Sequence, residues 1–455
     1  MTTLALRDVV VDGQRVSVRA EDGVITDVAS GMAAAAGDVE IDGCGGAAIP
    51  GLHDHHVHLA AMAAADRSVR VDGDLDGTIR SAHERVRPGA WLRVVGYDEV
   101  RDGPLDRYRL DALAPGRRVR VQHRSGAMWV LSSAALEAIA PPPEAAHDGR
   151  LFRMDEWLRE RIEAADTEGP PDVAAVARRL ASYGITGVTD ATPSTSLSAV
   201  SLLEQARPTL RVVATGGPPL AAAAFPAGIE RGPVKIVIGD DALPGLDEVV
   251  DGMRVAHGAD RTIAVHCVTR AALALAVAAW RTAGSLPGDR VEHASVAPPD
   301  LIDEMAGLGL TVVTQPGFVA ARGDAYLAEV DPGDRPHLYR CAALRAAGIP
   351  VGASSDAPFG PEDPWQAMKA AVDRRTASGA VVGEGERMPP ADALAMFLSP
   401  PDHPGGPPRR IQPGSPCDVV VLDCPLEQAL TDHDAEHVRL TISAGEVTYA
   451  RQAVR

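Results

Sequence analysis

Short runs of alternating apolar and polar residues occupy both ends of the chain. Near the N-terminus they cover residues 3–11, 15–20 and 23–29, and Asp12-Gly13 and Asp22-Gly23 separate them. Asp-Gly between alternating segments is a hairpin signal. Near the C-terminus, residues 418–422, 438–443 and 446–450 show the same pattern, with Ala444-Gly445 as a turn. The pattern predicts a small β-sandwich domain built from residues 1–46 and 406–455.

Between these ends, apolar runs of strand length alternate with longer stretches rich in Ala, Leu, Arg and Glu. The runs that we predict as buried strands are 47–52, 185–190, 210–215, 234–239, 263–267, 290–293, 310–314 and 349–354. Stretches such as 171–183, 271–283 and 299–307 have helical character. Eight strands that alternate with helices predict an α/β fold, a (β/α)₈ TIM-type barrel over residues 47–405.

The interval between the first two predicted strands is too long for a simple crossover. Residues from about 60 to 170 contain two more strand candidates, 91–97 and 118–124. We interpret this segment as an insertion that covers the mouth of the barrel.

Composition and charge exclude several classes of partner. The chain has 44 Lys and Arg against 62 Asp and Glu, so its formal net charge is 44 − 62 = −18. A field of that sign repels the phosphates of nucleic acids. Apolar residues make up 45% of the 455 residues, which suffices for a large core without disulfides. We therefore expect a small-molecule substrate and no nucleic-acid partner.

The cysteines and the apolar runs indicate the compartment. The five cysteines are scattered and none forms a C-x-x-C motif, which argues against a disulfide framework and a Cys-rich zinc site. The N-terminal residues lack the features of a signal peptide. No apolar run approaches the ~20 residues needed to cross a membrane. We expect a cytoplasmic protein that does not associate with membranes.

A histidine-rich segment, Pro50-Gly-Leu-His-Asp-His-His-Val-His-Leu59, contains the first candidate metal ligands. Residues two apart on a strand point to the same face, so His56 and His58 can bind one ion. Imidazole nitrogen suits Zn²⁺ and related metals. His53 and His55 have the same spacing on the opposite face, so spacing leaves both pairs open. An exposed His-rich loop is a further alternative.

Three polar residues stand at the ends of later predicted strands. His266 ends the run Thr-Ile-Ala-Val, His293 ends Arg-Val-Glu, and Asp356 follows Val-Gly-Ala-Ser-Ser. The active sites of such barrels are built at the C-terminal ends of the strands. Taken singly, a histidine there can be a hydrogen-bonded scaffold residue and an aspartate can be a helix N-cap. Taken with the histidine pair, they predict a metal centre.

Lys235 lies near the start of the predicted strand Val-Lys-Ile-Val-Ile-Gly. A charged residue inside an apolar strand is costly unless it is paired or modified. One interpretation is a lysine that reaches solvent or pairs with Asp240. The other is a neutral amine that takes up CO₂ and becomes a carbamate, an anion able to bridge two cations.

These residues together resemble the ligand pattern of the amidohydrolase superfamily of metal-dependent hydrolases. The matching positions, in family order, are His56, His58, Lys235, His266, His293 and Asp356. The family pattern Pro-Gly-x-x-Asp-x-His-x-His selects His56 and His58 over the other pair. Segments that resemble the branch containing N-substituted formamide deformylase are Gly96-Tyr-Asp-Glu, Gly184-Ile-Thr-Gly-Val-Thr-Asp, Val291-Glu-His and Ser355-Asp-Ala-Pro. The resemblance covers nearly the whole chain.

The resemblance implies a hydrolase that cleaves a C–N bond, of an amide or of an N-acyl or N-formyl compound, by attack of metal-bound hydroxide. The matching residues would hold one or two divalent ions, with Zn²⁺ favoured by the imidazole-rich ligand set. Lys235 would be N-carboxylated where it bridges two ions. Asp356 would shuttle the proton to the leaving nitrogen, and His293 would bind metal or stabilise the oxyanion. Many such enzymes form homodimers, which makes a homodimer a hypothesis here.

Departures from the branch leave its substrate open. Arg124-Ser-Gly-Ala127 stands where the branch often has Arg-Asp-Gly-His, and His266-Cys-Val-Thr-Arg-Ala271 stands where it often has His-Gly-Asp-Arg-Ala. Candidate substrate contacts in the inserted segment are Tyr97, Arg124 and Trp129, for which ordinary packing is the alternative. Arg124 could hold a substrate carboxylate bidentately.

Other functions on the same scaffold remain as alternatives. Aminoheterocycle deaminases often carry Glu three residues after the strand-5 histidine, where this chain has Thr269. A lactonase or a phosphotriesterase could use the same ions. A non-catalytic binding protein is the alternative from another class, although such relatives typically lose ligands and here none of the six is missing.

Overall fold

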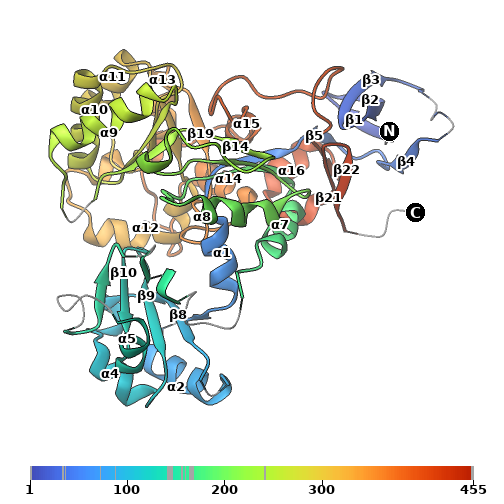
Figure 1. The fold of residues 1–455 in the computed structure, drawn as a ribbon. Coiled ribbons are helices and arrows are strands. Elements are labelled where there is room, and N and C mark those ends of the chain that lie inside the picture. Colours follow the sequence, from blue (N-terminus) through green and yellow to red (C-terminus); the bar gives the residue numbers. More distant parts are fainter. Residues whose placement is uncertain are drawn as a thin grey trace. The chain divides into compact units, whose positions relative to one another are not determined.

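We describe the fold from a computed structural model of the chain. It describes residues 3–32, 35, 37–71, 73–87, 89–140, 147–154, 157–158, 160–162, 169–239 and 242–451. The chain forms two compact units, one made of residues 1–59 and 173–455 and the other of residues 60–172 (Figure 1). The second unit corresponds to the segment that we interpret as an insertion.

Two four-stranded sheets contain the strands of the chain ends. One has the order β3-β2-β1-β4, and the other has the order β22-β21-β20-β5. The strands are β1 (Thr3–Val11), β2 (Gln14–Glu21), β3 (Val24–Ala29), β4 (Val39–Asp42), β5 (Ala48–Pro50), β20 (Val419–Leu422), β21 (Val438–Ser443) and β22 (Glu446–Ala450). Both residues of Asp12-Gly13, of Asp22-Gly23 and of Ala444-Gly445 have left-handed backbone angles, as two-residue hairpin turns require. The predicted hairpins are confirmed.

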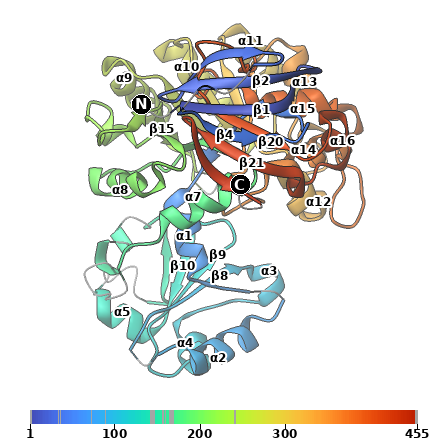
Figure 2. The ribbon, with the colours of Figure 1, turned by 90° about the vertical axis from the view of Figure 1, so that its right-hand side faces the viewer.

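The buried faces of these two sheets share one apolar core. Leu6 and Val18 of the first sheet belong to the same buried cluster as Val419, Val421 and Ile442 of the second. Strands from the two ends of the chain therefore lie side by side (Figure 2). Each sheet hides the apolar face that the other would leave exposed to water.

The shared core gives a stability prediction with a matched control. Val419 is fully buried, whereas Val39 of β4 is 54% exposed. We expect Val419→Ala to lower the free energy of unfolding by roughly 1.5–3 kcal/mol, because a buried valine loses transfer energy and packing. Val39→Ala should change it by less than about 0.5 kcal/mol. Urea unfolding of both variants checks this, and equal midpoints would contradict a core shared by the chain ends.

The centre of the first unit contains two parallel sheets, with the orders β14-β13-β12-β6 and β15-β16-β17-β18-β19. Their strands are β6 (Leu52–Val57), β12 (Ile185–Asp190), β13 (Arg211–Ala214), β14 (Ile229–Arg231), β15 (Val234–Val237), β16 (Ile263–Cys267), β17 (Arg290–His293), β18 (Thr311–Thr314) and β19 (Val351–Ala353). Within each sheet, every neighbouring pair is parallel. The predicted α/β architecture with parallel strands is confirmed.

The two parallel sheets are connected at both sides, by a short chain link at one side and by backbone hydrogen bonds at the other. Only Gly232 and Pro233 separate β14 from β15. At the other side, the Asp356 N–H donates to the His56 carbonyl and the His58 N–H donates to the Ala357 carbonyl, each at 2.9 Å. The segment after β19 is thus hydrogen-bonded to β6 and to the residue that follows it.

Helices connect the strands of this unit. They are α7 (Val173–Ser182), α8 (Leu197–Ser201), α9 (Leu246–Gly258), α10 (Arg270–Ala283), α11 (Pro299–Gly307), α12 (Gly317–Glu329), α13 (Cys341–Ala346), α14 (Pro364–Asp373), α15 (Pro390–Leu398) and α16 (Leu426–Asp432). Helix α10 illustrates how the sequence specifies these helices. The Thr269 hydroxyl caps its N-terminus by accepting from the Ala272 N–H, and its apolar face buries Leu273 and Trp280.

The first predicted strand, 47–52, is divided between two sheets, which corrects that part of the sequence interpretation. Its first half is β5 and pairs with β20, whereas the histidine-rich segment is β6 and pairs with β12. Pro50 has no N–H for a continued ladder, and Gly51 allows a close approach, since a Cβ there would lie 2.2 Å from Thr186 Cγ2. The alternative of an exposed His-rich loop is therefore wrong, because β6 is buried throughout.

Residues 60–172 form a five-stranded sheet of their own with the order β11-β10-β9-β8-β7. Its strands are β7 (Val69–Arg70), β8 (Leu92–Tyr97), β9 (Val119–His123), β10 (Met128–Leu131) and β11 (Arg150–Phe152), accompanied by α2 (Leu75–Arg85), α3 (Glu99–Asp102), α4 (Arg107–Leu113) and α5 (Ser133–Ile139). Helix α1 (Leu59–Asp66) leads into the unit. Both strands predicted within this segment are confirmed.

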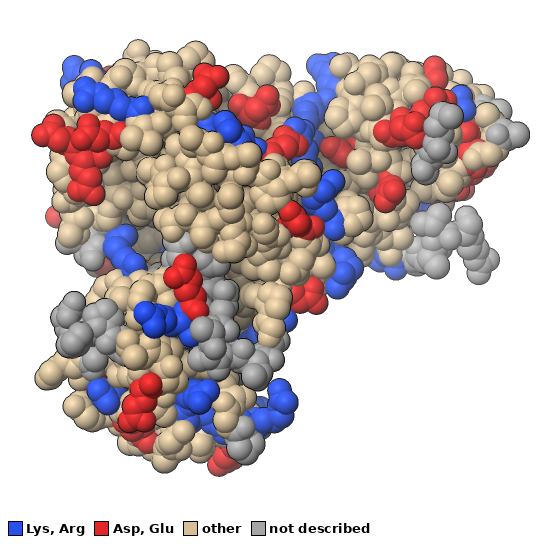
Figure 3. Space-filling view, viewed as in Figure 1, with Lys and Arg blue, Asp and Glu red and all other residues tan. Residues whose placement is uncertain are grey.

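The charge distribution on the surface and the length of the helices are relevant to nucleic-acid and membrane partners. Basic and acidic side chains are interspersed on the face shown in Figure 3, without a dense blue patch. None of the helices in the described ranges is both long and apolar enough to cross a membrane.

Candidate active site

Three of the predicted ligands converge where β6 and β19 end: His56 lies within β6, His58 directly follows it, and Asp356 follows β19. The ligand atoms of His56, His58 and Asp356 all lie within 4.8 Å of one another. Asp356 Oδ1 is 3.5 Å from His56 Nε2 and 3.2 Å from His58 Nε2. These residues are neighbours because backbone hydrogen bonds join the segment after β19 to β6. Two imidazoles and a carboxylate at this spacing suit a divalent transition metal.

The remaining predicted histidines adjoin this cluster. The ring centroids of His56 and His293 are 4.9 Å apart, and those of His266 and His293 are 4.4 Å apart. His293 Nδ1 is 4.0 Å from Asp356 Oδ2. The structure thus gathers residues from β6, β16 and β17 and the segment after β19.

Hydrogen bonds set the orientation of two of these rings. His56 Nδ1 is 2.6 Å from Glu292 Oε2, and His293 Nδ1 is 2.7 Å from Gln315 Oε1. The Gln315 amide is oriented by its donation to Ser354 Oγ. Because a carboxylate or carbonyl oxygen only accepts, each ring carries its proton on Nδ1 and keeps the lone pair on Nε2. This is the arrangement found behind metal-binding histidines.

Burial keeps His56 and His293 neutral. Desolvation lowers the pKa of His56 well below its ordinary value, and the charges of Lys235 and His58 lower it further. Desolvation, with the neighbouring His266 and His56, also lowers the pKa of His293. Neutral imidazole is the form that binds a metal. The low pKa therefore keeps the ring nitrogens of His56 and His293 in the form that a cation requires.

Lys235 is buried beside the cluster, with 2% of its surface exposed. Desolvation lowers the pKa of its amine, while the charges of Glu292 and Asp356 act in the opposite direction. Its Nζ has no hydrogen-bond partner among the described residues. The interpretation that Lys235 reaches solvent is therefore wrong. The alternative pairing with Asp240 stays a prediction, because Asp240 lies outside the described residues.

Two predicted ligands have an uncommon backbone conformation. His293 has a φ of 73° and Asp356 a φ of 54°, both in the left-handed region. Such residues cost roughly 1–2 kcal/mol each relative to the right-handed conformation. Strain of this kind persists where surrounding contacts enforce it and is concentrated at functional sites.

The second histidine pair lies outside the cluster. His53 Nε2 is 3.0 Å from Thr189 Oγ1, and His55 Nε2 is 2.9 Å from Ser399 Oγ. Both rings are buried and point to the opposite side of β6 from His56. The family pattern selected the pair that the structure places with Asp356.

The candidate substrate contacts all belong to the unit of residues 60–172. Tyr97 is fully buried and donates to the Gly103 carbonyl, and Trp129 is buried in an apolar cluster. Arg124 Nε lies 3.0 Å from Asp98 Oδ2. Their role towards a substrate stays a prediction, and the contacts observed within the unit are those of ordinary packing and ion pairing.

Sequence reasoning missed the residues that orient the candidate ligands. Glu292 and Arg290 are buried in β17 and paired with each other, Gln315 follows β18, and Thr192 Oγ1 lies 3.0 Å from His58 Nδ1. Two charged residues in the short buried run Arg-Val-Glu-His were the available signal. The residue counts also single out Lys235, because only Lys235 and Lys369 are lysines among the 44 basic residues.

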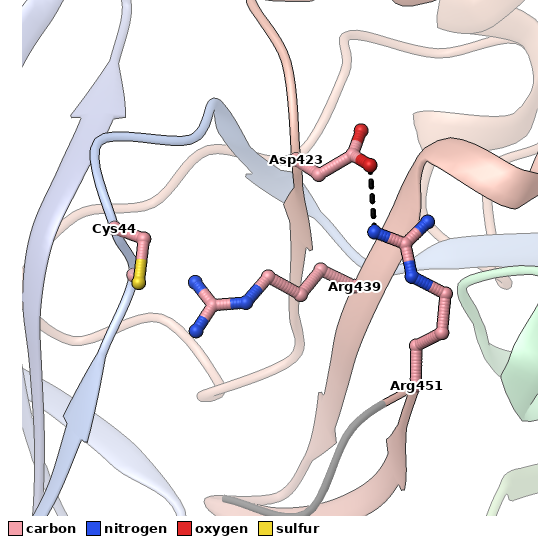
Figure 4. Close-up of a pocket in the computed structure, with 5 residues that line it drawn as sticks. Cys44, Asp423, Arg439 and Arg451 are labelled. Carbon is pink, nitrogen blue, oxygen red and sulfur yellow. Dashed lines mark hydrogen bonds and ion pairs between the residues drawn. The ribbon is translucent and has the colours of Figure 1, made fainter.

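A second group of potential ligands lies beside the sheet of the C-terminal strands: Asp423 and Cys424 follow β20, and His437 precedes β21. Both ring nitrogens of His437 are engaged, by Asp423 at 3.0 Å and by Asp432 at 2.9 Å. A cavity of about 270 Å³ beside it is lined by Asp423, Arg451, Cys44, Arg439 and Gly43, with Asp423 paired to Arg451 (Figure 4). Desolvation lowers the pKa of His437, but its two carboxylate partners outweigh this and raise it. An ion-pair network, rather than a metal site, explains this group.

Comparison with known proteins identifies the family. The model of the amidohydrolase family matches residues 39–449. The chain belongs to the amidohydrolase family. This amidohydrolase is 25% identical over 529 aligned positions to N-substituted formamide deformylase of Arthrobacter pascens, covering 97% of this chain and 95% of that protein. The predicted superfamily is confirmed, and the chain is a hydrolase that acts on carbon–nitrogen bonds.

Solved structures show the same fold for this amidohydrolase. An uncharacterised metal-dependent hydrolase of Pyrococcus horikoshii OT3 matches with a TM-score of 0.76 and 19% identity, over 96% of this chain and 99% of that one. N-isopropylammelide isopropylaminohydrolase of Burkholderia multivorans matches with a TM-score of 0.57 and 16% identity, over 100% of both chains. These likenesses imply a TIM-barrel-type α/β fold.

Proposed function

We propose that this amidohydrolase uses a divalent metal and Asp356 to hydrolyse an amide, with N-formyl or N-acyl amines as substrates. The observation that carries the proposal is the convergence of His56, His58 and Asp356, whose ligand atoms lie within 4.8 Å of one another. The similarity to a formamide deformylase supports the substrate class.

The residues present fit a metal. His56, His58, His266, His293 and Asp356 would hold the first ion, and Lys235 would join them where a second ion binds. His293 Nε2 and Lys235 Nζ are buried polar atoms without a hydrogen-bond partner among the described residues. Such atoms are costly unless a ligand satisfies them. Zn²⁺ suits the imidazole-rich set, and a bound divalent ion would supply Lewis acidity and lower the pKa of water to about 7.

Lys235 is proposed to be N-carboxylated. Burial lowers the pKa of its amine, and the neutral amine is nucleophilic. Its attack on CO₂ forms an N–C bond as one C=O π bond opens, and the nitrogen releases one proton. The composition supports a role that only a lysine can fill at position 235. Of the 44 basic residues, 44 − 2 = 42 are arginines, and the one other lysine is Lys369. Arginine, always protonated, could not form the carbamate.

Asp356 is proposed to move the proton. Its carboxylate accepts a proton from the water whose oxygen bonds to the substrate carbonyl carbon. The same proton then passes from Asp356 to the substrate nitrogen as the C–N bond breaks, so that a neutral amine leaves with the carboxylic acid as the other product. The position of Oδ1, within 3.5 Å of both histidine Nε2 atoms, supports this role.

We also infer the finer architecture from the observed contacts. The links between the two parallel sheets at Gly232-Pro233 and at Asp356–His56 support closure into a (β/α)₈ barrel. The shared apolar core supports a sandwich of the two terminal sheets. A cytoplasmic location, a homodimer and the domain boundaries remain proposals.

The function is tested with a panel of substrates on zinc-loaded and chelated protein. The panel contains N-formyl amines, N-acyl amines, an aminoheterocycle and a lactone. We expect release of the amine from an N-formyl or N-acyl compound, loss of this activity on chelation and its return with Zn²⁺. Full activity in protein shown to be metal-free would overturn the proposal.

One further observation separates this proposal from a deaminase. Thr269, which stands where deaminases often have Glu, uses its hydroxyl to cap α10. Ammonia release from the aminoheterocycle, without cleavage of the amides, would contradict the substrate class that we propose and favour a deaminase.

A further inference from the structure

Glu292 is fully buried in β17, yet both of its carboxylate oxygens have partners. Oε2 lies 2.6 Å from His56 Nδ1, and Oε1 accepts from Arg290 Nε at 2.7 Å. The two contacts connect a buried cation to a predicted metal ligand through one carboxylate. A buried carboxylate without such partners would be strongly disfavoured.

Arg290 fixes the direction of this carboxylate. Its side chain is 2% exposed, and its Nη2 also donates to the His55 carbonyl at 3.4 Å. Arg290 and Glu292 point to the same side of β17 because they are two residues apart. The pair therefore brings no net charge into the interior and holds Oε2 towards His56.

We infer that Glu292 is a positioning residue for the metal: it holds the proton of His56 on Nδ1 and thereby directs the Nε2 lone pair to the ion. The inference rests on the proposed metal-dependent function. An anionic acceptor also makes the imidazole a stronger donor to a cation than a neutral acceptor does. His293 provides the contrast within the same site, because its Nδ1 faces the neutral amide oxygen of Gln315.

Glu292→Gln tests this role with little change of shape. The variant gives His56 the kind of neutral acceptor that His293 already has. We expect the dissociation constant for Zn²⁺, measured by competition with a chromophoric chelator, to rise roughly 10–100-fold. The visible spectrum of the Co²⁺-loaded variant should change as well, because the ligand field of His56 changes.

The single variant leaves Arg290 without its counter-ion and could fail to fold, so a second variant removes the charge pair. Arg290→Met with Glu292→Gln keeps the interior neutral. We expect this double variant to regain thermal stability while its Zn²⁺ affinity stays roughly 10–100-fold weaker. If the pair were only structural, recovery of folding would restore the wild-type affinity, and that result would overturn the inference.

Asp289→Asn is the matched control. Asp289 is fully buried, immediately precedes β17 and accepts from Trp280 Nε1 and the Ile263 N–H. We expect this variant to lose stability without a change in Zn²⁺ affinity. An equal loss of affinity in Asp289→Asn would show that any damage near β17 disturbs the site, and would overturn the specific role of Glu292.

The wild-type titration separates the two proposals. If wild-type protein does not bind Zn²⁺, the proposed function fails. If it binds Zn²⁺ and Glu292→Gln binds with the same affinity and the same Co²⁺ spectrum, only the role of Glu292 fails.

Discussion

Asp356→Asn is expected to lower kcat by roughly 10²–10⁴-fold, the contribution typical of a general acid–base group. Asparagine keeps an oxygen near His56 and His58, so metal should stay bound, but its amide cannot accept and return the proton. KM should change much less than kcat, because the lost interaction belongs to the transition state. Steady-state kinetics and metal content per chain, measured on the same preparation, check both parts.

Asp190→Asn provides the control for this variant. Asp190 ends β12, and its carboxylate accepts from the Leu59 and Thr192 N–H groups, which gives it a positional role. We expect a much smaller effect on kcat from Asp190→Asn. Near wild-type turnover in Asp356→Asn, with metal present, would remove Asp356 from the proton transfer.

Lys235→Ala is expected to reduce the metal content from two ions per chain to one or none, with a corresponding loss of activity. The carbamate would supply the bridging oxygens, and alanine supplies none. In wild-type protein prepared with ¹³C-bicarbonate, a carbamate carbon signal should appear and should be absent from the variant. The assignment is simple because the chain has only two lysines, and a carbamate on the N-terminal amine would remain in the variant.

Lys369→Ala is the matched control, since the Lys369 side chain is 56% exposed and paired with Asp373. It should retain the carbamate signal, the metal content and the activity. One ion in both wild type and Lys235→Ala would make Lys235 structural and indicate a mononuclear enzyme. No ion in either, with folding intact, would contradict the metal-dependent function and favour a binding protein.

Much of the fold was predictable because its signals are local. Alternation of apolar residues located the terminal strands, and Asp12-Gly13 and Asp22-Gly23 located the turns between them. The division of 47–52 was not predictable in this way. It depends on which sheet each half contacts, and residues far along the chain, in β12 and β20, decide that.

The candidate ligands were predictable for a different reason. Polar residues that end buried strands are conspicuous, and their order along the chain matched a family pattern. The roles of Glu292 and Gln315 were not predictable, because the role of a buried polar side chain depends on which residue it contacts, and the sequence does not give that contact. Glu292 and His56 are 236 positions apart in sequence, and their contact exists only after β6 and β17 take their places.

The sequence by itself determined the alternation of strands and helices, the family and the residue types available to bind a metal. Periodicity, turn residues and ordered motifs are properties of the chain alone. The tertiary structure decided which histidine pair faces Asp356, which ring nitrogen is left to bind an ion, and that Lys235 is buried. These depend on distances between segments remote in sequence, and on the exclusion of water that packing between them produces.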